Sequence, residues 1–91
     1  MRDCMDVEAV TRRLKKVEGQ IRGLIRMVEE DKPCEGILVQ IGAAKAALHK
    51  TGQIILEGHL HHCVLDAVRA GNEDEALKKL TGALEQFSRT V

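Results

Sequence analysis

The sequence predicts an all-α protein that forms a single small domain over residues 1–91. Apolar residues recur at intervals of three and four along most of the chain, which is the spacing of amphipathic helices. Alternating apolar and polar runs, which would indicate strands, are not seen. The chain has no tryptophan or tyrosine and one phenylalanine, so a monomer would have a thin core. We therefore expect further copies of the chain to complete the core.

The first helix is expected over about residues 7–30, where one apolar stripe has basic residues beside and behind it. The stripe consists of Val10, Leu14, Val17, Ile21, Leu24, Ile25 and Val28. The segment DKPCEG then ends this helix. Pro33 suits the first turn of the next helix, with Asp31 or Lys32 before it as the cap region.

The second helix is expected over about residues 33–70, where Gly52 and Gly58 are each unfavourable in a helix interior and are expected to loosen or kink it locally. Gly71 fits the position just past its C-terminus. Asn72 with Glu75 three residues later fits a capping box. The third helix is therefore expected over about residues 73–88.

The formal net charge is zero, but the basic residues are unevenly distributed. Between residues 11 and 27 the only acid is Glu18, whereas arginine and lysine are dense. A neutral protein can still bind phosphate through one basic helix if that helix forms a continuous patch. The residues that we expect to contact DNA phosphates are Arg12, Arg13, Lys15, Lys16, Arg22 and Lys50. Because no helix-turn-helix signature is present, sequence readout would depend on a tetramer-wide patch and on DNA shape.

Composition favours a cytoplasmic protein with no membrane partner. No apolar run approaches the roughly 20 residues that cross a bilayer, and the first ten residues lack the apolar core of a signal peptide. Thiols stay reduced in the cytoplasm. The three cysteines, Cys4, Cys34 and Cys63, are also an odd number for a disulfide scaffold, so metal or redox chemistry is the better interpretation.

The stretch GHLHHC concentrates three of the four histidines beside a cysteine. At about 100° per residue, His59 and Cys63 both lie within roughly 20° of the line through Cys34. His61 lies on the opposite side of the helix, and His62 lies about 80° away. A rise of about 1.5 Å per residue would separate Cys34 from His59 by roughly 37 Å, which no single metal ion can span. An antiparallel partner helix would bring Cys34 of one chain to His59 and Cys63 of the other.

Two thiolates and one imidazole form a soft donor set that favours Cu(I). Zn(II) is the main competitor if His62 or a water supplies a fourth ligand. A catalytic metal would need an open position and a general base in a cleft, and neither is evident, so we do not expect an enzyme. We interpret His49 and His61 as solvated side chains and Cys4 as uninvolved.

Three segments, RRLKKVEGQIRGLIRMVEEDKPC, ILVQIGAAKAAL and GHLHHCVLDAVRAG, resemble the copper-sensitive operon repressor (CsoR) family over about residues 8–85. The resemblance implies a three-helix protomer, an antiparallel dimer forming a four-helix bundle, and a dimer of dimers. It implies that the metal-free protein binds operator double-stranded DNA and that the effector releases it. The implied Cu(I) ligands are Cys34 from one protomer with His59 and Cys63 from the other. The resemblance points to Arg13 and to Lys50, which replaces an arginine of the family, as DNA-binding residues.

The chain also departs from the copper sensors of this family, which often carry a tyrosine before the first ligand cysteine and a glutamate in the third helix. Here these positions are Pro33 and Lys79. Nickel sensors of the family replace the last cysteine with histidine, whereas this chain has Cys63. The alternatives that stay open are a persulfide or thiol switch between Cys34 and Cys63 of different protomers, a repressor sensing Zn or Ni, and a metal-buffering bundle without a DNA role.

Overall fold

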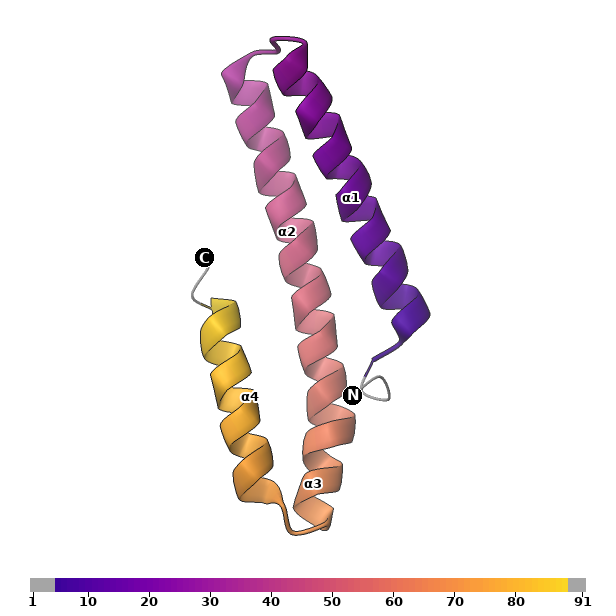
Figure 1. Cartoon of the computed structure of the whole chain (residues 1–91), viewed down its shortest axis with the longest axis vertical. Helices are drawn as coiled ribbons and strands as arrows, with labels where there is room; N and C mark the ends of the chain where they lie inside the picture. Colours follow the sequence, from indigo (N-terminus) through magenta and orange to yellow (C-terminus); the bar gives the residue numbers. More distant parts are fainter. Residues whose placement is uncertain (1–4, 89–91) are drawn as a thin grey trace. The chain divides into compact units, whose positions relative to one another are not determined.

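The computed structural model describes residues 5–88, apart from the side chains of His61, Cys63 and Val64. Its elements in chain order are α1 (Val7–Glu29), α2 (Cys34–Gly58), the π-helix η2 (His59–Val64), α3 (Leu65–Arg69) and α4 (Glu73–Ser88) (Figure 1). All elements of the described part are helical, which confirms the all-α class. The chain divides into two compact units. The N-terminal unit is Val7–Gln53, and the C-terminal unit is residues 54–88 together with residues 5–6.

In the N-terminal unit, α1 and the first part of α2 form an antiparallel hairpin (Figure 1). Its buried residues are Val10 and Val17 of α1 and Ala44 and Thr51 of α2. The hydroxyl of Thr51 donates a hydrogen bond of 2.9 Å to the carbonyl of Ala47, so this buried polar group is satisfied within its own helix. The buried positions of this hairpin are therefore occupied by small side chains.

The helices α1 and α3 end in the same helix-terminating motif. At the end of α1, the N–H groups of Asp31 and Lys32 donate to the carbonyls of Val28 and Met27, and Asp31 has a φ of 57°. This pattern is a Schellman motif, whose left-handed residue is usually glycine. The sequence pattern assigned Asp31 only to the cap region before α2, so its left-handed conformation is a finding of the structure.

The corresponding motif after α3 has the expected glycine. Gly71 has a φ of 82°, and the N–H groups of Gly71 and Asn72 donate to the carbonyls of Val68 and Ala67. The prediction that Gly71 lies just past the helix end is confirmed. α4 begins at Glu73, directly after Asn72, and spans the predicted residues.

The two motifs give a paired stability prediction. We expect Asp31→Gly to raise the free energy of unfolding by about 1 kcal/mol, because a left-handed residue with a Cβ atom is strained. Gly71→Ala should lower it by a similar amount for the same reason. Urea unfolding midpoints at an unchanged m-value would measure both. A destabilised Asp31→Gly protein would contradict the left-handed assignment.

The predicted second helix over residues 33–70 departs from a regular α-helix at one point, directly after Gly58. Residues 59–64 form a π-helix, a wider type of turn that is defined by hydrogen bonds to the carbonyl five residues earlier rather than four. The chain stays helical on both sides, and no proline lies in the segment. An apolar pattern read at 3.6 residues per turn cannot show one wider turn, because too few apolar positions lie within it. α4 packs against η2 and α3, and its Leu80 is buried.

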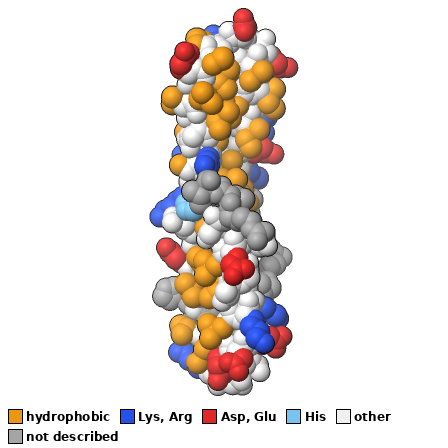
Figure 2. Space-filling view, turned by 90° about the vertical axis from the view of Figure 1, so that its left-hand side faces the viewer, with side chains coloured by type: hydrophobic (Ala, Val, Ile, Leu, Met, Phe, Trp, Pro, Cys, Tyr) orange, Lys and Arg blue, Asp and Glu red, His pale blue; other side chains and the backbone are white. Residues whose placement is uncertain are grey.

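A single chain leaves much of its apolar surface exposed. In the N-terminal unit Leu38 and Val39 are each 67% exposed, and further large apolar side chains are at least 43% exposed. These further residues are Leu14, Ile21, Ile25, Val28, Ile41 and Leu48. Figure 2 shows hydrophobic side chains gathered on the viewed face near the α1–α2 turn, at the top of the picture. Contiguous exposed apolar surface of this kind marks an interaction site.

None of the described helices has an apolar stretch long enough to cross a membrane.

Candidate metal centre and nucleic-acid interface

Cys34 is the first residue of α2 and belongs to the N-terminal unit. Its side chain is exposed and its thiol is free rather than disulfide-bonded. Pro33 precedes it, and the Pro33 carbonyl accepts a hydrogen bond of 3.2 Å from the Ile37 N–H. The prediction that Pro33 lies inside the helix is wrong by one residue, because α2 starts at Cys34. The thiol of Cys34 is nevertheless exposed at the N-terminal end of α2.

His59 is the first residue of η2 and belongs to the C-terminal unit. Its side chain is half-buried, whereas His62 is exposed. The side chains of Cys63 and His61 lie outside the described residues, and so does Cys4. The backbone at position 63 lies in the same π-helical segment as His59.

The described side chains of one chain do not assemble a metal centre. Among them, no group of three histidine, cysteine or acidic residues is close enough to hold an ion. Cys34 and His59 lie in different compact units.

The donor chemistry of the three residues fits Cu(I). Cys34 would contribute an accessible thiolate, and His59 would contribute an imidazole from a partly shielded position. Soft thiolate donors with few ligands favour Cu(I) over harder divalent ions. Carboxylates, which would favour Mg²⁺ or Ca²⁺, are not part of this set.

Lys79 occupies a position on α4 where the resemblance leads one to expect a glutamate. Its Nζ lies 3.4 Å from Glu75 Oε1, and both side chains are well exposed. An exposed pair of this type contributes at most about 1 kcal/mol to stability. Lys79 therefore acts as a surface cation in the described structure and presents no acid to orient a ligand histidine.

The six residues expected to bind DNA all belong to the N-terminal unit and are all exposed. Five lie on α1, and Arg12 and Lys16, four residues apart, share one side of that helix. Arg22 differs from the others, because its Nη1 lies 3.3 Å from Glu18 Oε1. This ion pair partly neutralises Arg22, so we expect it to contribute less to phosphate binding than Arg12 or Lys16. The pairing was not predicted from the sequence.

In the hairpin, one basic residue of α1 and one of α2 lie at similar heights along the helix axes. A Cβ atom at Gly36 of α2 would lie 3.8 Å from Met27 Cε of α1, which marks where the helices face each other. Arg13 lies 14 residues before Met27, and Lys50 lies 14 residues after Gly36. Because both helices rise by about 1.5 Å per residue, counting from this contact puts Arg13 and Lys50 within roughly one helical turn of the same height in the hairpin. The basic surface can thus extend from α1 onto α2.

A cavity of about 380 Å³ lies in the same unit, with Gln20, Leu24, Met27 and Gln40 among its lining residues. The side-chain oxygen of Gln20 is buried and has no hydrogen-bond partner among the described residues. Apolar periodicity did not single out Gln20, because it lies between the stripe positions of α1.

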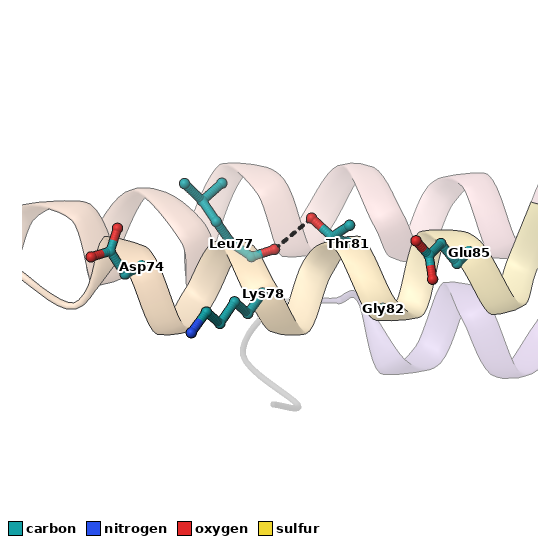
Figure 3. Close-up of a pocket in the computed structure, with 6 residues that line it drawn as sticks. All are labelled: Asp74, Leu77, Lys78, Thr81, Gly82 and Glu85. Carbon is teal, nitrogen blue, oxygen red and sulfur yellow. Dashed lines mark hydrogen bonds between the residues drawn. The ribbon is translucent and has the colours of Figure 1, made fainter.

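A shallow groove of about 560 Å³ runs along α4 (Figure 3). Its lining residues are Asp74, Leu77, Lys78, Thr81, Gly82 and Glu85, all from one helix. The Thr81 hydroxyl donates to the Leu77 carbonyl at 2.8 Å, so its proton is already engaged. Catalytic sites bring groups from several elements together in a cleft, and this groove does not.

Comparison with solved structures supports the fold. The copper-sensing repressor CsoR from Geobacillus thermodenitrificans, solved with Cu(I), aligns with a TM-score of 0.87 at 44% identity, covering 90% of this chain and 85% of that one. The nickel-responsive regulator InrS aligns with a TM-score of 0.81 at 35% identity, covering 90% of this chain and 92% of that one. Similar folds at this identity thus serve different metals.

Sequence comparison gives the family. The copper-sensing repressor CsoR of Bacillus subtilis is 42% identical over 83 residues, covering 91% of this chain and 82% of its own length. The copper-sensing repressor RicR of Mycobacterium tuberculosis is 42% identical over 81 residues, covering 87% of this chain and 84% of its own. The model of the metal-sensitive transcriptional repressor family matches residues 3–86. The chain therefore belongs to the family of metal-sensitive transcriptional repressors, which are regulators and not enzymes.

Proposed function

We propose that this protein is a Cu(I)-sensing repressor that binds operator double-stranded DNA in its metal-free form and releases it when Cu(I) binds. The observation that carries the proposal is the soft donor set of Cys34, His59 and Cys63 on a chain 42% identical to a copper-sensing repressor. A nickel-responsive regulator has a similar fold, so the fold does not identify the metal. We infer copper from the donor atoms. The site needs reduced thiols, and thiols stay reduced in the cytoplasm, where we place this protein.

The assembly that completes the site is a homodimer, with two dimers forming a tetramer. Within one chain, the thiol of Cys34 and the imidazole of His59 belong to separate units. The exposed apolar residues of α1 and α2 provide a surface that a second copy can bury. In an antiparallel dimer, Cys34 of one protomer would meet His59 and Cys63 of the other, giving two sites.

The chain's own residues suggest how the site communicates with DNA. When bound, Cu(I) supplies strong bonds to thiolate and imidazole groups of both protomers. His59 is the first residue of η2, and α4 packs directly against η2. A shift of η2 would therefore displace α4 and alter the contact with the protomer that supplies Cys34. If Cu(I) binds more tightly to the conformation with low DNA affinity, DNA lowers Cu(I) affinity by the same factor.

A thiol-switch repressor is the second candidate. The exposed, free thiol of Cys34 is accessible to a persulfide donor, and Lys79 stands where the resemblance to copper sensors leads one to expect a glutamate. In this case Cys34 and Cys63 of different protomers would form a disulfide or polysulfide link. Such a switch would not need the imidazole of His59.

Mixing two inactive variants tests the cross-protomer site. Chains with Cys34→Ala and chains with His59→Ala should each lose tight Cu(I) binding. When the two are co-refolded at equal amounts, half of the dimers combine both chains, and each mixed dimer contains one intact site. We expect about one tight Cu(I) per four chains. Anaerobic competition against a chromophoric Cu(I) chelator measures this stoichiometry.

The control is the same mixing with two lots of Cys34→Ala chains, which should recover no binding. If the mixture of different variants also recovers none while both variants remain helical and oligomeric, each site is formed within one chain. That result would contradict the proposed assembly.

A further inference from the structure

The helix α2 is continuous from Cys34 to Gly58 and belongs to both compact units (Figure 1). The boundary between the units falls within it, between residues 53 and 54. The N-terminal unit carries the residues expected to bind DNA, of which Lys50 lies closest to this boundary in the sequence, and the C-terminal unit carries His59. The backbone of α2 at the boundary is therefore a covalent path from one unit to the other.

The residues just before this boundary weaken the helix in two independent ways. Gly52 lies in the helix interior, where only proline is less favourable than glycine. The hydroxyl of Thr51 donates to the Ala47 carbonyl at 2.9 Å, and this is the carbonyl that the α-helical pattern assigns to the Thr51 N–H. Such back-bonding slightly destabilises helices and often bends them. Both features make this turn of α2 easier to bend.

The burial of Thr51 gives its hydrogen bond a particular role in bending. The side chain is only 2% exposed, so water has little access beside it. A bend that separates the Thr51 N–H from the Ala47 carbonyl would ordinarily leave that carbonyl without a partner, which is costly where water is excluded. Here the hydroxyl keeps the carbonyl bonded. The helix can therefore open at Thr51 at a lower cost than at a turn without such a hydroxyl.

We propose that Thr51 and Gly52 form a hinge in α2 that transmits Cu(I) binding in the C-terminal unit to the DNA-binding residues of the N-terminal unit. The inference rests on the proposed function and names the element that couples metal to DNA. Such coupling requires an element with two arrangements that the two ligands favour differently. A straight and a bent α2 would be these arrangements, with DNA favouring one and Cu(I) the other.

Stiffening the hinge tests the proposal. Gly52→Ala replaces the weak helix former, and Thr51→Val removes the hydroxyl while keeping a branched side chain in the buried position. In the double variant, the Cu(I)-driven fall in DNA affinity should shrink from about 5- to 150-fold to less than about threefold. By linkage, Cu(I) should then bind equally well with and without DNA, still at about one per chain. Each single substitution should give a partial loss, so either one serves if the double variant does not fold.

Two matched controls separate a hinge from a general effect of these substitutions. Gly42→Ala adds a methyl group elsewhere in α2, where no described atom beyond the local helix backbone lies within 4 Å of the new Cβ atom. Thr81→Val removes the same type of hydrogen bond, 2.8 Å to the Leu77 carbonyl, from α4. Both should keep wild-type release of DNA. If Thr51→Val/Gly52→Ala also keeps it and remains helical by circular dichroism, the hinge does not couple the two sites.

Amide hydrogen exchange detects the hinge without copper or DNA. We expect the amides of residues 51–55 to exchange faster in the wild type than those in the middle of α1, and Thr51→Val/Gly52→Ala to slow them. Equal protection of the two segments in the wild type would overturn the proposal. If Cu(I) does not release DNA from the wild type, the proposed function fails, and the exchange rates still decide whether α2 opens at Thr51 and Gly52.

Discussion

His59→Ala is expected to abolish Cu(I)-driven release of DNA while leaving the metal-free protein's DNA affinity within about threefold of wild type. The side chain supplies one of three proposed donors, and its loss should lower Cu(I) affinity by at least about 100-fold. His59 lies in the C-terminal unit, whereas the basic residues lie in the N-terminal unit, so DNA binding itself should persist. In the wild type, we expect Cu(I) to lower the DNA affinity by about 5- to 150-fold. In the variant, Cu(I) should leave the DNA affinity almost unchanged. Fluorescence anisotropy of labelled DNA measures both quantities.

His62→Ala is the matched control, because it removes an exposed imidazole from the same turn. It should leave Cu(I) affinity and DNA release close to wild type. The His59→Ala protein also separates the two candidate functions. If it still releases DNA with a persulfide donor, and the wild type does not respond to Cu(I), the thiol switch is the function.

The double substitution Arg13→Glu/Lys16→Glu is expected to lower DNA affinity by at least about 1,000-fold at low salt. Both side chains are exposed on α1, and a tetramer would carry eight reversed charges. The slope of log affinity against log salt should become shallower by about 0.9 for each DNA phosphate that the variant no longer neutralises. Cu(I) stoichiometry should not change, because neither residue is near a ligand position in the sequence.

Lys32→Glu controls for the charge reversal itself, with one reversal per chain instead of two. Lys32 is exposed in the same unit, 4.0 Å from Glu30, and it lies outside the expected DNA surface. It should reduce DNA affinity by far less than the double substitution. If DNA affinity survives in the Arg13→Glu/Lys16→Glu protein, the basic face of α1 is not the DNA interface. If the wild type binds Cu(I) and no DNA, the buffering alternative becomes the better description.

Helix positions were predictable where local chemistry determines them. Gly71 and the cap region at Asn72 place the start of α4 at Glu73, because a left-handed glycine and a capping residue act within a few residues. The end of α1 was predicted within one residue, but the left-handed Asp31 was not. Aspartate adopts that conformation more readily than most non-glycine residues, but it does so in few of its positions, and composition does not reveal which.

The candidate site was only partly predictable. The types and spacing of Cys34, His59 and Cys63 indicate a soft metal site, because residue identity determines donor chemistry. The π turn at His59 was not foreseen, because backbone hydrogen bonding decides it rather than the apolar period. The prediction that the three ligands meet across protomers stays a prediction, since it concerns two chains. The pairing of Arg22 with Glu18 depends on rotamers as well as on their four-residue spacing.

The most direct test of Cu(I)-controlled repression is an anaerobic Cu(I) titration of the reduced protein bound to labelled DNA from upstream of its own gene. Fluorescence anisotropy follows the DNA, and chelator competition follows the metal. We expect the DNA to be released as Cu(I) reaches about one equivalent per chain, because a dimer would hold two sites. If Cu(I) binds at that stoichiometry and the DNA stays bound, copper is not the effector, and the persulfide switch through Cys34 and Cys63 becomes the leading explanation.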